Sequence, residues 1–182
     1  SKILEIGAGS APHYKFIKHS YDEYHIIETS ENILNTYNDN SKVIASHYDG
    51  KIIPYENEYF DRIIISHCLE HINFPEEFLF ETMTKLKKGG VLSISLPTDP
   101  GLLFRVGRLY LKLFSIKKKY MLTSEKFDYM NATEHVNSIF GLHSIIKYNF
   151  GKLIKETYLP FRIKSFDLNL FYNVHIIKKD WI

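Results

Sequence analysis

The feature that most constrains this fold is the alternation of short apolar segments with turn-like or helical stretches over roughly the first hundred residues. Runs rich in isoleucine, valine and leucine that are bounded by turn residues are typical of β-strands. Strands that alternate with helices over short connections form a parallel sheet, because each right-handed crossover returns the chain in the same direction. The strands predicted in this way are Lys2–Ile6, Tyr24–Glu28, Lys42–His47, Phe60–Ser66 and Val91–Leu96.

Helices are predicted in the segments between these strands. Two short ones span Pro12–His19 and Glu31–Tyr37. A longer amphipathic helix over Pro75–Lys87 has its end marked by Lys87-Lys88-Gly89-Gly90, since basic residues followed by glycine favour a helix C-terminus. The consecutive isoleucines of Phe60–Ser66 predict a strand that is buried on both faces of the sheet.

The later part of the chain interrupts the alternation. Residues 98–135 form an insertion, after which a helix is expected over Glu134–Phe150 and two further strands over Leu153–Tyr158 and Asn169–Ile177. No repeat or linker divides the sequence, so residues 1–182 are expected to form one domain.

Composition narrows the class of protein. The chain is 45% hydrophobic and 24% charged, which is ordinary for a globular domain. Its formal net charge of +2 is too small to indicate nucleic acid, and no nucleic-acid partner is expected. The one cysteine, Cys68, excludes an internal disulfide and is expected to be a buried apolar side chain. No apolar run is long enough for a spanning helix, and a cytoplasmic location is expected.

A glycine turn follows the first predicted strand. Gly7 and Gly9 lack a Cβ, so a ligand can approach the backbone there. Glu28 ends the second strand, where a carboxylate can accept hydrogen bonds from both hydroxyls of a ribose. Asp49 follows the third strand and can accept from an exocyclic amine such as that of adenine. Because such sheets bind ligands beyond the carboxyl ends of their strands, these residues predict a nucleoside-containing ligand.

Together these motifs resemble the class I S-adenosylmethionine-dependent methyltransferases, in particular the type 11, UbiE-like group. The resemblance is close over residues 2–97 and loose over the last 50 residues. It includes the acidic residue Glu28 at the end of the second strand and the Phe60-Asp61 entry to the fourth. The other matching motifs are Leu4-Glu5-Ile6-Gly7-Ala8-Gly9-Ser10, Asp49-Gly50-Lys51-Ile52-Ile53-Pro54-Tyr55, Leu69-Glu70-His71 and Leu86-Lys87-Lys88-Gly89-Gly90.

The resemblance implies an α/β fold: a Rossmann-like, doubly wound, seven-stranded sheet, mostly parallel with the last strand antiparallel and a helical insertion after strand 5. It implies S-adenosylmethionine as cofactor and S-adenosylhomocysteine as product. Gly7 and Gly9 would lie near the methionine part, Glu28 would hold the ribose and Asp49 the adenine amine. The cofactor-binding residues implied are Glu5, Gly7, Ala8, Gly9, Glu28, Thr29, Asp49, Gly50, Ser66 and His67.

Two features depart from the family pattern. Ala11 and Pro12 replace the usual third glycine and its neighbour, which stiffens the turn. Only Ser1 precedes the first predicted strand, whereas relatives carry a longer segment there that often caps the cofactor. Either the chain is a truncated product, or the cap is expected to come from residues 98–135 or from a partner chain.

Methyl transfer from a sulfonium needs alignment of the acceptor and, for a hydroxyl, a base to remove its proton. Candidate bases are His67, His71 and His135, of which His71 and His135 are the predicted catalytic residues. The alternatives are a structural role for His71, and a segment around His135 in which Thr133 or Asn137 caps the next helix. No pair of histidines shows metal-ligand spacing with acidic or cysteine partners, so no catalytic metal is predicted.

Residues 101–120 predict a basic amphipathic helix within the insertion. Leu102, Val106, Leu109, Leu113 and Ile116 recur at helical spacing, and Arg105, Arg108, Lys112 and Lys119 lie on the opposite face. Such a helix can lie on an anionic membrane, but the favoured interpretation is a substrate lid, 98–135, whose apolar stripe packs on the core. Its charge suits a small anionic acceptor, whether nucleotide-linked or lipid-linked.

Two other function classes compete with a methyltransferase. A dehydrogenase would share the glycine turn and an acidic residue, but it would have a third glycine at Ala11 and no Asp49–Tyr55 motif. The more serious alternative is a non-catalytic α/β module that has lost its cofactor site. The sequence does not indicate the acceptor, the atom that is methylated or the oligomeric state.

Overall fold

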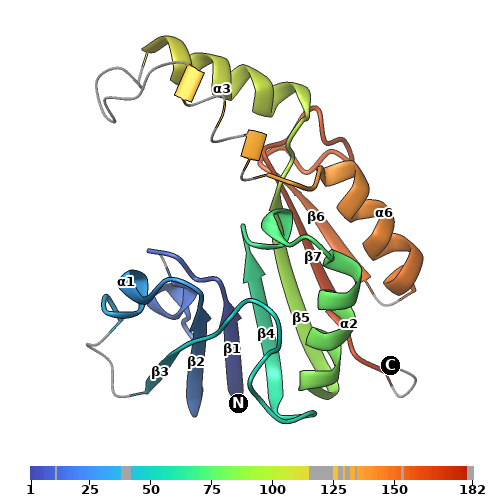
Figure 1. Ribbon diagram of the computed structural model, residues 1–182. Coiled ribbons are helices and arrows are strands. Elements are labelled where there is room, and N and C mark those ends of the chain that lie inside the picture. Colours follow the sequence, from blue (N-terminus) through green and yellow to red (C-terminus); the bar gives the residue numbers. More distant parts are fainter. Residues whose placement is uncertain are drawn as a thin grey trace.

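A computed structural model describes residues 1–10, 12–37, 42–114, 125–126, 129, 132–133, 135–152 and 154–179. It contains one seven-stranded sheet in the order β3-β2-β1-β4-β5-β7-β6 (Figure 1). Strands β1 to β5 are parallel, and β7 runs antiparallel to both β5 and β6, as the expected fold requires. The strands are β1 (Lys2–Ile6), β2 (Glu23–Glu28), β3 (Val43–His47), β4 (Phe60–Ser66), β5 (Leu86–Pro97), β6 (Ile154–Leu159) and β7 (Phe171–Ile177).

Helices cover the sheet unevenly. Two helices, α2 (Pro75–Lys85) and α6 (Ile139–Phe150), pack side by side over the β4, β5, β7 and β6 part of one face (Figure 1). A short helix, α1 (Glu31–Leu34), contacts β2 and β3, and α3 (Leu102–Phe114) extends beyond the carboxyl ends of the central strands (Figure 1). Two 3-10 helices, η1 (His13–Phe16) and η2 (Leu69–His71), follow β1 and β4.

Alternation along the strands divides the core between the two faces. Leu4, Ile63, Leu92 and Val174 share the cluster that α2 and α6 cover, as the period of two in a strand requires. On the opposite face, a smaller cluster around Ile3, Tyr24, Ile26 and Tyr37 packs under η1 and α1. The strands β1, β2 and β3 on which these clusters pack are parallel, so their carboxyl ends lie along one edge of the sheet.

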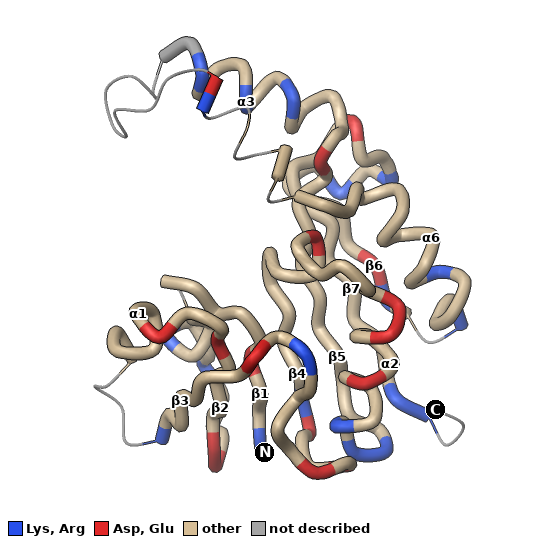
Figure 2. The backbone as a smooth tube through the Cα atoms, in the orientation of Figure 1, with Lys and Arg blue, Asp and Glu red and all other residues tan. Residues whose placement is uncertain are grey.

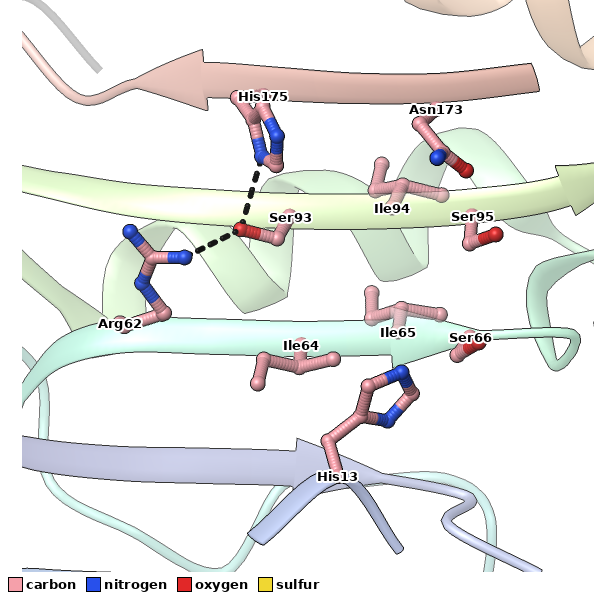
Figure 3. A pocket seen from close by; sticks show the side chains of 10 residues that line it. All are labelled: His13, Arg62, Ile64, Ile65, Ser66, Ser93, Ile94, Ser95, Asn173 and His175. Carbon is pink, nitrogen blue, oxygen red and sulfur yellow. Dashed lines mark hydrogen bonds between the residues drawn. The ribbon is translucent and has the colours of Figure 1, made fainter. Parts of the chain in front are cut away.

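The remaining part of that opposite face is polar, and it corrects one prediction. Ile64 is only partly buried, so β4 is not buried on both faces. Its neighbours there are hydrophilic: Arg62 and His175 both bond the hydroxyl of Ser93, at 3.4 and 3.0 Å (Figure 3). Consecutive isoleucines indicated two-sided burial, but the adjacent strands β5 and β7 present serine, asparagine and histidine on this side.

Several helix boundaries also differ from the predictions. The helix expected over Pro75–Lys87 ends at Lys85, and β5 begins at the next residue; Gly89, at φ +77°, lies in this strand rather than at a helix end. The helix expected from Glu134 begins at Ile139. The helix expected over Pro12–His19 is reduced to η1, and α1 ends at Leu34 rather than Tyr37. In each case the pattern identified the element, whereas tertiary contacts determined its ends.

Helix α3 contradicts the prediction that its apolar stripe packs on the core. Leu102, Val106 and Leu109 are 51%, 52% and 55% exposed. Leu113 and Ile116, predicted on the same stripe, and Lys119 of the basic face lie outside the described side chains. An amphipathic period shows that a helix has two faces, but it does not show which face a neighbour covers. No helix among the described residues is long and apolar enough to cross a membrane.

The loop between β6 and β7 is held by a single buried side chain, Asn169. Its Oδ1 accepts from the Phe161 amide at 3.0 Å, and its Nδ2 donates to the carbonyls of Ile163 and Ser165 at 2.8 and 2.7 Å. The residue is fully buried, so water cannot replace these partners once they are lost.

We expect Asn169→Leu, which keeps the volume but removes three hydrogen bonds, to lower the free energy of unfolding by about 3 kcal/mol. Urea unfolding followed by circular dichroism measures this. The control is Asn57→Leu, because Asn57 is exposed and accepts one bond from Lys85, and we expect it to change stability by less than about 0.5 kcal/mol. Equal effects of the two substitutions would contradict the role of Asn169.

Candidate active site

The ends of three adjacent parallel strands form the candidate cofactor site. Gly7 follows β1, and its amide donates to the carbonyl of Ile27 in β2 at 3.0 Å. Glu28 ends β2 and pairs with His47 at the end of β3. Asp49 follows two residues later. Since the strands are parallel and in register, the glycine turn, Glu28 and Asp49 lie along the same edge of the sheet.

Glu28 is buried and already shapes the glycine turn. Its Oε1 accepts from the Gly9 amide at 2.6 Å, and the hydroxyl of Tyr37 donates to the Gly9 carbonyl. Among the described residues, and apart from the two chain neighbours of Gly9, no atom lies within 4 Å of the position that a Cβ on Gly9 would occupy, so the turn is open on that side. A hollow of about 310 Å³ lies over the turn, lined by Gly7, Ala8, Gly9, Ser10, His13, Ser66 and His67.

Asp49 forms a tight turn at the end of β3. Its Oδ1 accepts from the amides of Lys51 and Ile52 at 2.9 and 3.4 Å, and these bonds hold the pKa of the carboxyl below its usual range. Gly50, at φ +78°, lies 3.6 Å from the Thr29 side chain, measured from the position of a Cβ. A second hollow of about 480 Å³ lies between this turn and the loop after β4, lined by Gly50, Lys51, His71, Ile72, Asn73, Phe74, Glu77, Phe78 and Glu81.

Glu5, also predicted to bind the cofactor, lies under the glycine turn with its carboxylate occupied by protein groups. The carboxylate bonds the His13 amide at 2.9 Å and the His13 ring at 2.5 Å, and it accepts from the Tyr24 hydroxyl at 2.7 Å. Glu5 is 1% exposed, so these bonds fix the segment that follows the turn. His13 thereby borders both the hollow over the turn and the polar hollow of about 250 Å³ on the sheet face (Figure 3).

His13 makes stability depend on pH. The bond to Glu5 raises the pKa of its half-exposed imidazole; His67, Arg62 and His175 are the other basic groups around it. This contribution is therefore fully present below the unfolded pKa, about 6.5, and is lost as pH rises through the higher folded value. We expect wild-type protein to lose stability relative to His13→Gln between pH 6 and pH 9 in urea unfolding. Parallel stability profiles for the two proteins would contradict this.

Ser66 and His67 lie at the end of β4, beside the glycine turn. His67 has a left-handed backbone, at φ +50°, and its ring packs edge-on against Phe171 at 5.3 Å between centroids. Burial lowers its pKa, and the neighbouring histidines 13, 135 and 71 lower it further. The imidazole is therefore held toward its neutral form next to the hollow over the turn.

A cluster of polar side chains adjoins His67 at the carboxyl ends of β4 and β5. The rings of His71 and His135 lie 5.1 Å apart. His135 Nδ1 is 3.0 Å from Asp99 Oδ2, which also accepts from Arg108 at 2.6 Å. Buried Glu70 lies beneath, and burial raises the pKa of its carboxyl. The structure thus brings together the two histidines predicted to be catalytic.

The segment that carries His135 is tied to the loop after β4. The Asn137 amide donates to the Glu70 carbonyl at 3.1 Å, and its side chain donates to the Ile72 carbonyl at 2.6 Å. The N-cap of α6 is Ser138, whose hydroxyl accepts from the Gly141 amide at 3.3 Å, so the alternative in which Thr133 or Asn137 caps this helix is wrong. Neither Asp99 nor Arg108 was predicted as a site residue. Glu70 was named only as part of the Leu69-Glu70-His71 motif and was given no role.

Comparison with known proteins agrees with this architecture. A family model described as a methyltransferase domain matches residues 4–94, half of the chain. No curated protein matches the sequence. All the solved structures below are less than 20% identical to the chain, and their similarity therefore concerns the fold.

One similar structure is the plantazolicin methyltransferase BpumL with a pentazolic analogue and SAH, at TM-score 0.70 and 18% identity, covering 98% of this chain and 76% of that chain. Another is a methyltransferase from Thermotoga maritima, described as a possible histamine N-methyltransferase, at TM-score 0.62 and 18% identity, covering 98% and 82%. A third is the [4+2]-cyclase SpnF, at TM-score 0.66 and 12% identity, covering 98% and 74%. The family match, the strand order and the motifs agree: the chain belongs to the methyltransferase domain family and is an S-adenosylmethionine-dependent methyltransferase.

Proposed function

We propose that this enzyme methylates a small anionic acceptor, which binds between α3 and the histidine cluster, the group formed by Glu70, His71, Asp99 and His135. The observation that carries the proposal is the arrangement at the sheet edge: an open glycine turn, a buried acid and an ionised aspartate follow three neighbouring strands, and His71 and His135 lie at the ends of the next two. A cofactor on the first three strands would then face an acceptor next to the histidines.

The residues that would hold the cofactor fit its chemistry. The open side of Gly9 admits the methionine part next to Ser66 and His67, and Glu28 accepts from the ribose hydroxyls. Asp49, whose carboxyl stays ionised, accepts from the adenine amine. Bound S-adenosylmethionine supplies a methyl group activated by the sulfonium. In the same proposal Gly7, Ala8, Thr29 and Gly50 shape the turns, and Glu5 positions them through His13.

The acceptor class follows from charge. Helix α3 carries Arg105, Arg108 and Lys112 and no acidic residue (Figure 2). Asp99 accepts from Arg108 and also bonds His135, so this one carboxylate is shared between two basic side chains. We propose that residues 98–135 act as the lid of the acceptor site and that the acceptor carries a phosphate or carboxylate, including nucleotide-linked and lipid-linked compounds. Contact of residues 101–120 with a membrane surface stays a prediction.

Calorimetric titration tests the cofactor part of this proposal. We expect S-adenosylhomocysteine to bind the protein at one molecule per chain and NADH not to bind. A methylation screen with radiolabelled methyl donor then compares phosphorylated or carboxylated acceptors with their uncharged analogues, and the charged members should react faster. Faster reaction of the uncharged set would overturn the acceptor class while leaving the cofactor site intact.

A further inference from the structure

Three side chains of types that commonly bind metal ions, one carboxylate and two imidazoles, lie together at the edge of the candidate active site. Glu70 and His71 come from η2, and His135 comes from the end of the insertion. One carboxylate oxygen and one nitrogen from each imidazole all lie within 4.8 Å of one another. Residues so distant in the chain were not predicted to form a metal site, because spacing in the sequence could not show that they meet.

The first observation that points to a bound ligand is the environment of the Glu70 carboxylate. It is only 2% exposed, and among the described residues its Oε2 has no hydrogen-bond partner. Its Oε1 is 3.8 Å from His67 Nδ1 and 3.9 Å from His71 Nε2, both too long for a hydrogen bond. A buried carboxylate oxygen without a partner costs free energy, and a bound cation would remove that cost.

The second observation is the contact between Asp99 and His135. It bonds Nδ1 of His135 at 3.0 Å and is itself held by Arg108 at 2.6 Å. A histidine that donates from one ring nitrogen to a carboxylate presents the other nitrogen, here Nε2, as an unprotonated ligand. Metal-bound histidines in proteins usually have such a partner, which fixes the ring and raises its basicity.

We propose that Glu70, His71 and His135 bind one divalent transition-metal ion, with Asp99 orienting His135. Ligand atoms around a tetrahedral ion bound at about 2.1 Å lie roughly 3.4 Å apart. The three groups, which lie within 4.8 Å of one another, must therefore close by up to about 1.4 Å. The side chains of His71 and His135 are 39% and 20% exposed, so part of each ring borders solvent. Two imidazoles and one carboxylate favour Zn²⁺, Co²⁺ or Fe²⁺ over Mg²⁺, which prefers an all-oxygen shell.

The role of this ion rests on the proposed function. His67 borders the hollow over the glycine turn and also lies against Glu70, so the ion would adjoin the acceptor position. An ion with three protein ligands keeps a position for an acceptor oxygen and lowers the pKa of a bound hydroxyl. The hydroxyl proton passes to water, and the oxyanion forms the new O–CH₃ bond as the S–CH₃ bond breaks with its electron pair on sulfur. The acceptor class is then a hydroxyl compound.

Metal binding is tested without any acceptor. Untagged full-length protein is stripped with EDTA and titrated with Co²⁺, whose visible absorption reports coordination by nitrogen and oxygen. Zn²⁺ should displace Co²⁺ at one ion per chain, and excess Mg²⁺ should not. S-adenosylhomocysteine binding, measured on the same preparations, reports separately on the cofactor site.

Variants assign the ligands. We expect Glu70→Gln and His135→Asn to weaken Co²⁺ binding at least about 100-fold, and Asp99→Asn to weaken it about 10- to 100-fold. The matched control is His19→Asn, because His19 is exposed and distant from these residues in the sequence, and it should bind Co²⁺ as wild type does. Circular dichroism shows whether each variant is folded; if Glu70→Gln does not fold, His135→Asn at the partly exposed position decides.

The outcomes separate the two proposals. Weak or absent Co²⁺ binding by wild type, with S-adenosylhomocysteine still bound, would overturn the metal site and leave the cofactor proposal intact. Co²⁺ binding that Glu70→Gln and His135→Asn do not change would also overturn it, since the ion would then bind elsewhere. Metal binding that depends on these residues, in protein that does not bind S-adenosylhomocysteine, would support the metal site and overturn the proposed cofactor site.

Discussion

We expect the substitution Glu28→Gln to lower the affinity for S-adenosylhomocysteine about 100- to 1,000-fold. Glutamine can still accept from the Gly9 amide through its carbonyl oxygen, so the turn that Glu28 shapes should survive. The substitution removes the negative charge and puts an amide donor where the ribose hydroxyls must donate. Two charge-assisted hydrogen bonds are lost, which is worth about 3 to 4 kcal/mol. Isothermal titration of wild type and variant under the same buffer measures the ratio of dissociation constants.

The control for this result is Glu31→Gln. Glu31 is an exposed acid at the start of α1, three residues after Glu28, and it should leave the affinity unchanged. Thermal unfolding of both variants checks that neither has lost its fold. Unaltered binding by Glu28→Gln would remove Glu28 from the ribose site, whereas equal weakening by both variants would point to a general electrostatic effect.

Gly7→Ala and Gly9→Ala separate a structural glycine from a ligand-facing one. Both glycines have positive φ, +67° and +56°, so alanine costs about 1 to 2 kcal/mol at either position. A Cβ on Gly7 would also lie 2.7 Å from Cys68 Sγ, whereas one on Gly9 would meet no atom of another described residue within 4 Å, its chain neighbours aside. Overpacking adds about 1 to 3 kcal/mol at Gly7 alone. We therefore expect Gly7→Ala to lower Tm by about 5 to 15 °C, and Gly9→Ala to lower it by less than about half of that.

For the affinity for S-adenosylhomocysteine, we expect the opposite order, with Gly9→Ala as the variant that loses affinity out of proportion to its loss of stability. The alanine methyl at position 9 would enter the hollow over the turn. Gly9→Ala should therefore weaken the binding of S-adenosylhomocysteine by more than its small loss of stability explains. Adding Cys68→Ala to Gly7→Ala removes the close sulfur and should recover part of the lost Tm. Identical Tm values for the single and double variants would show that the Cys68 contact is not the cause.

Features that depend on residues close together in the sequence, or on the alternation of strands and turns, were predicted correctly. Glu28 and Asp49 were expected to lie on one edge because parallel strands end together, and the register of β1, β2 and β3 has that arrangement. The glycines after Lys87 were misread, because basic residues followed by glycine mark a helix end in many proteins. Here helix α2 passes directly into β5, and Gly89 is in the strand.

The histidine cluster shows why the rest was not predictable. Glu70 comes from η2, whereas Asp99 and His135 come from the two ends of the insertion, and no short-range pattern relates them. Their meeting depends on the order of β4 and β5 and on the bonds of Asn137 to the loop after β4. The exposure of Leu102, Val106 and Leu109 could not be predicted for the same reason, because it depends on which segments pack against α3 and not on the sequence of α3 itself.

The amino-acid sequence by itself determined the strand and helix alternation, the parallel sheet and the family, because hydrophobic period and turn residues act over a few neighbouring positions. Only the tertiary structure decided which side chains face one another across the carboxyl ends of β4 and β5 and which part of the opposite sheet face is polar. It also decided that, among the described residues, Oε2 of Glu70 is buried without a hydrogen-bond partner. Those properties depend on contacts between distant segments, whose free energies no local pattern contains.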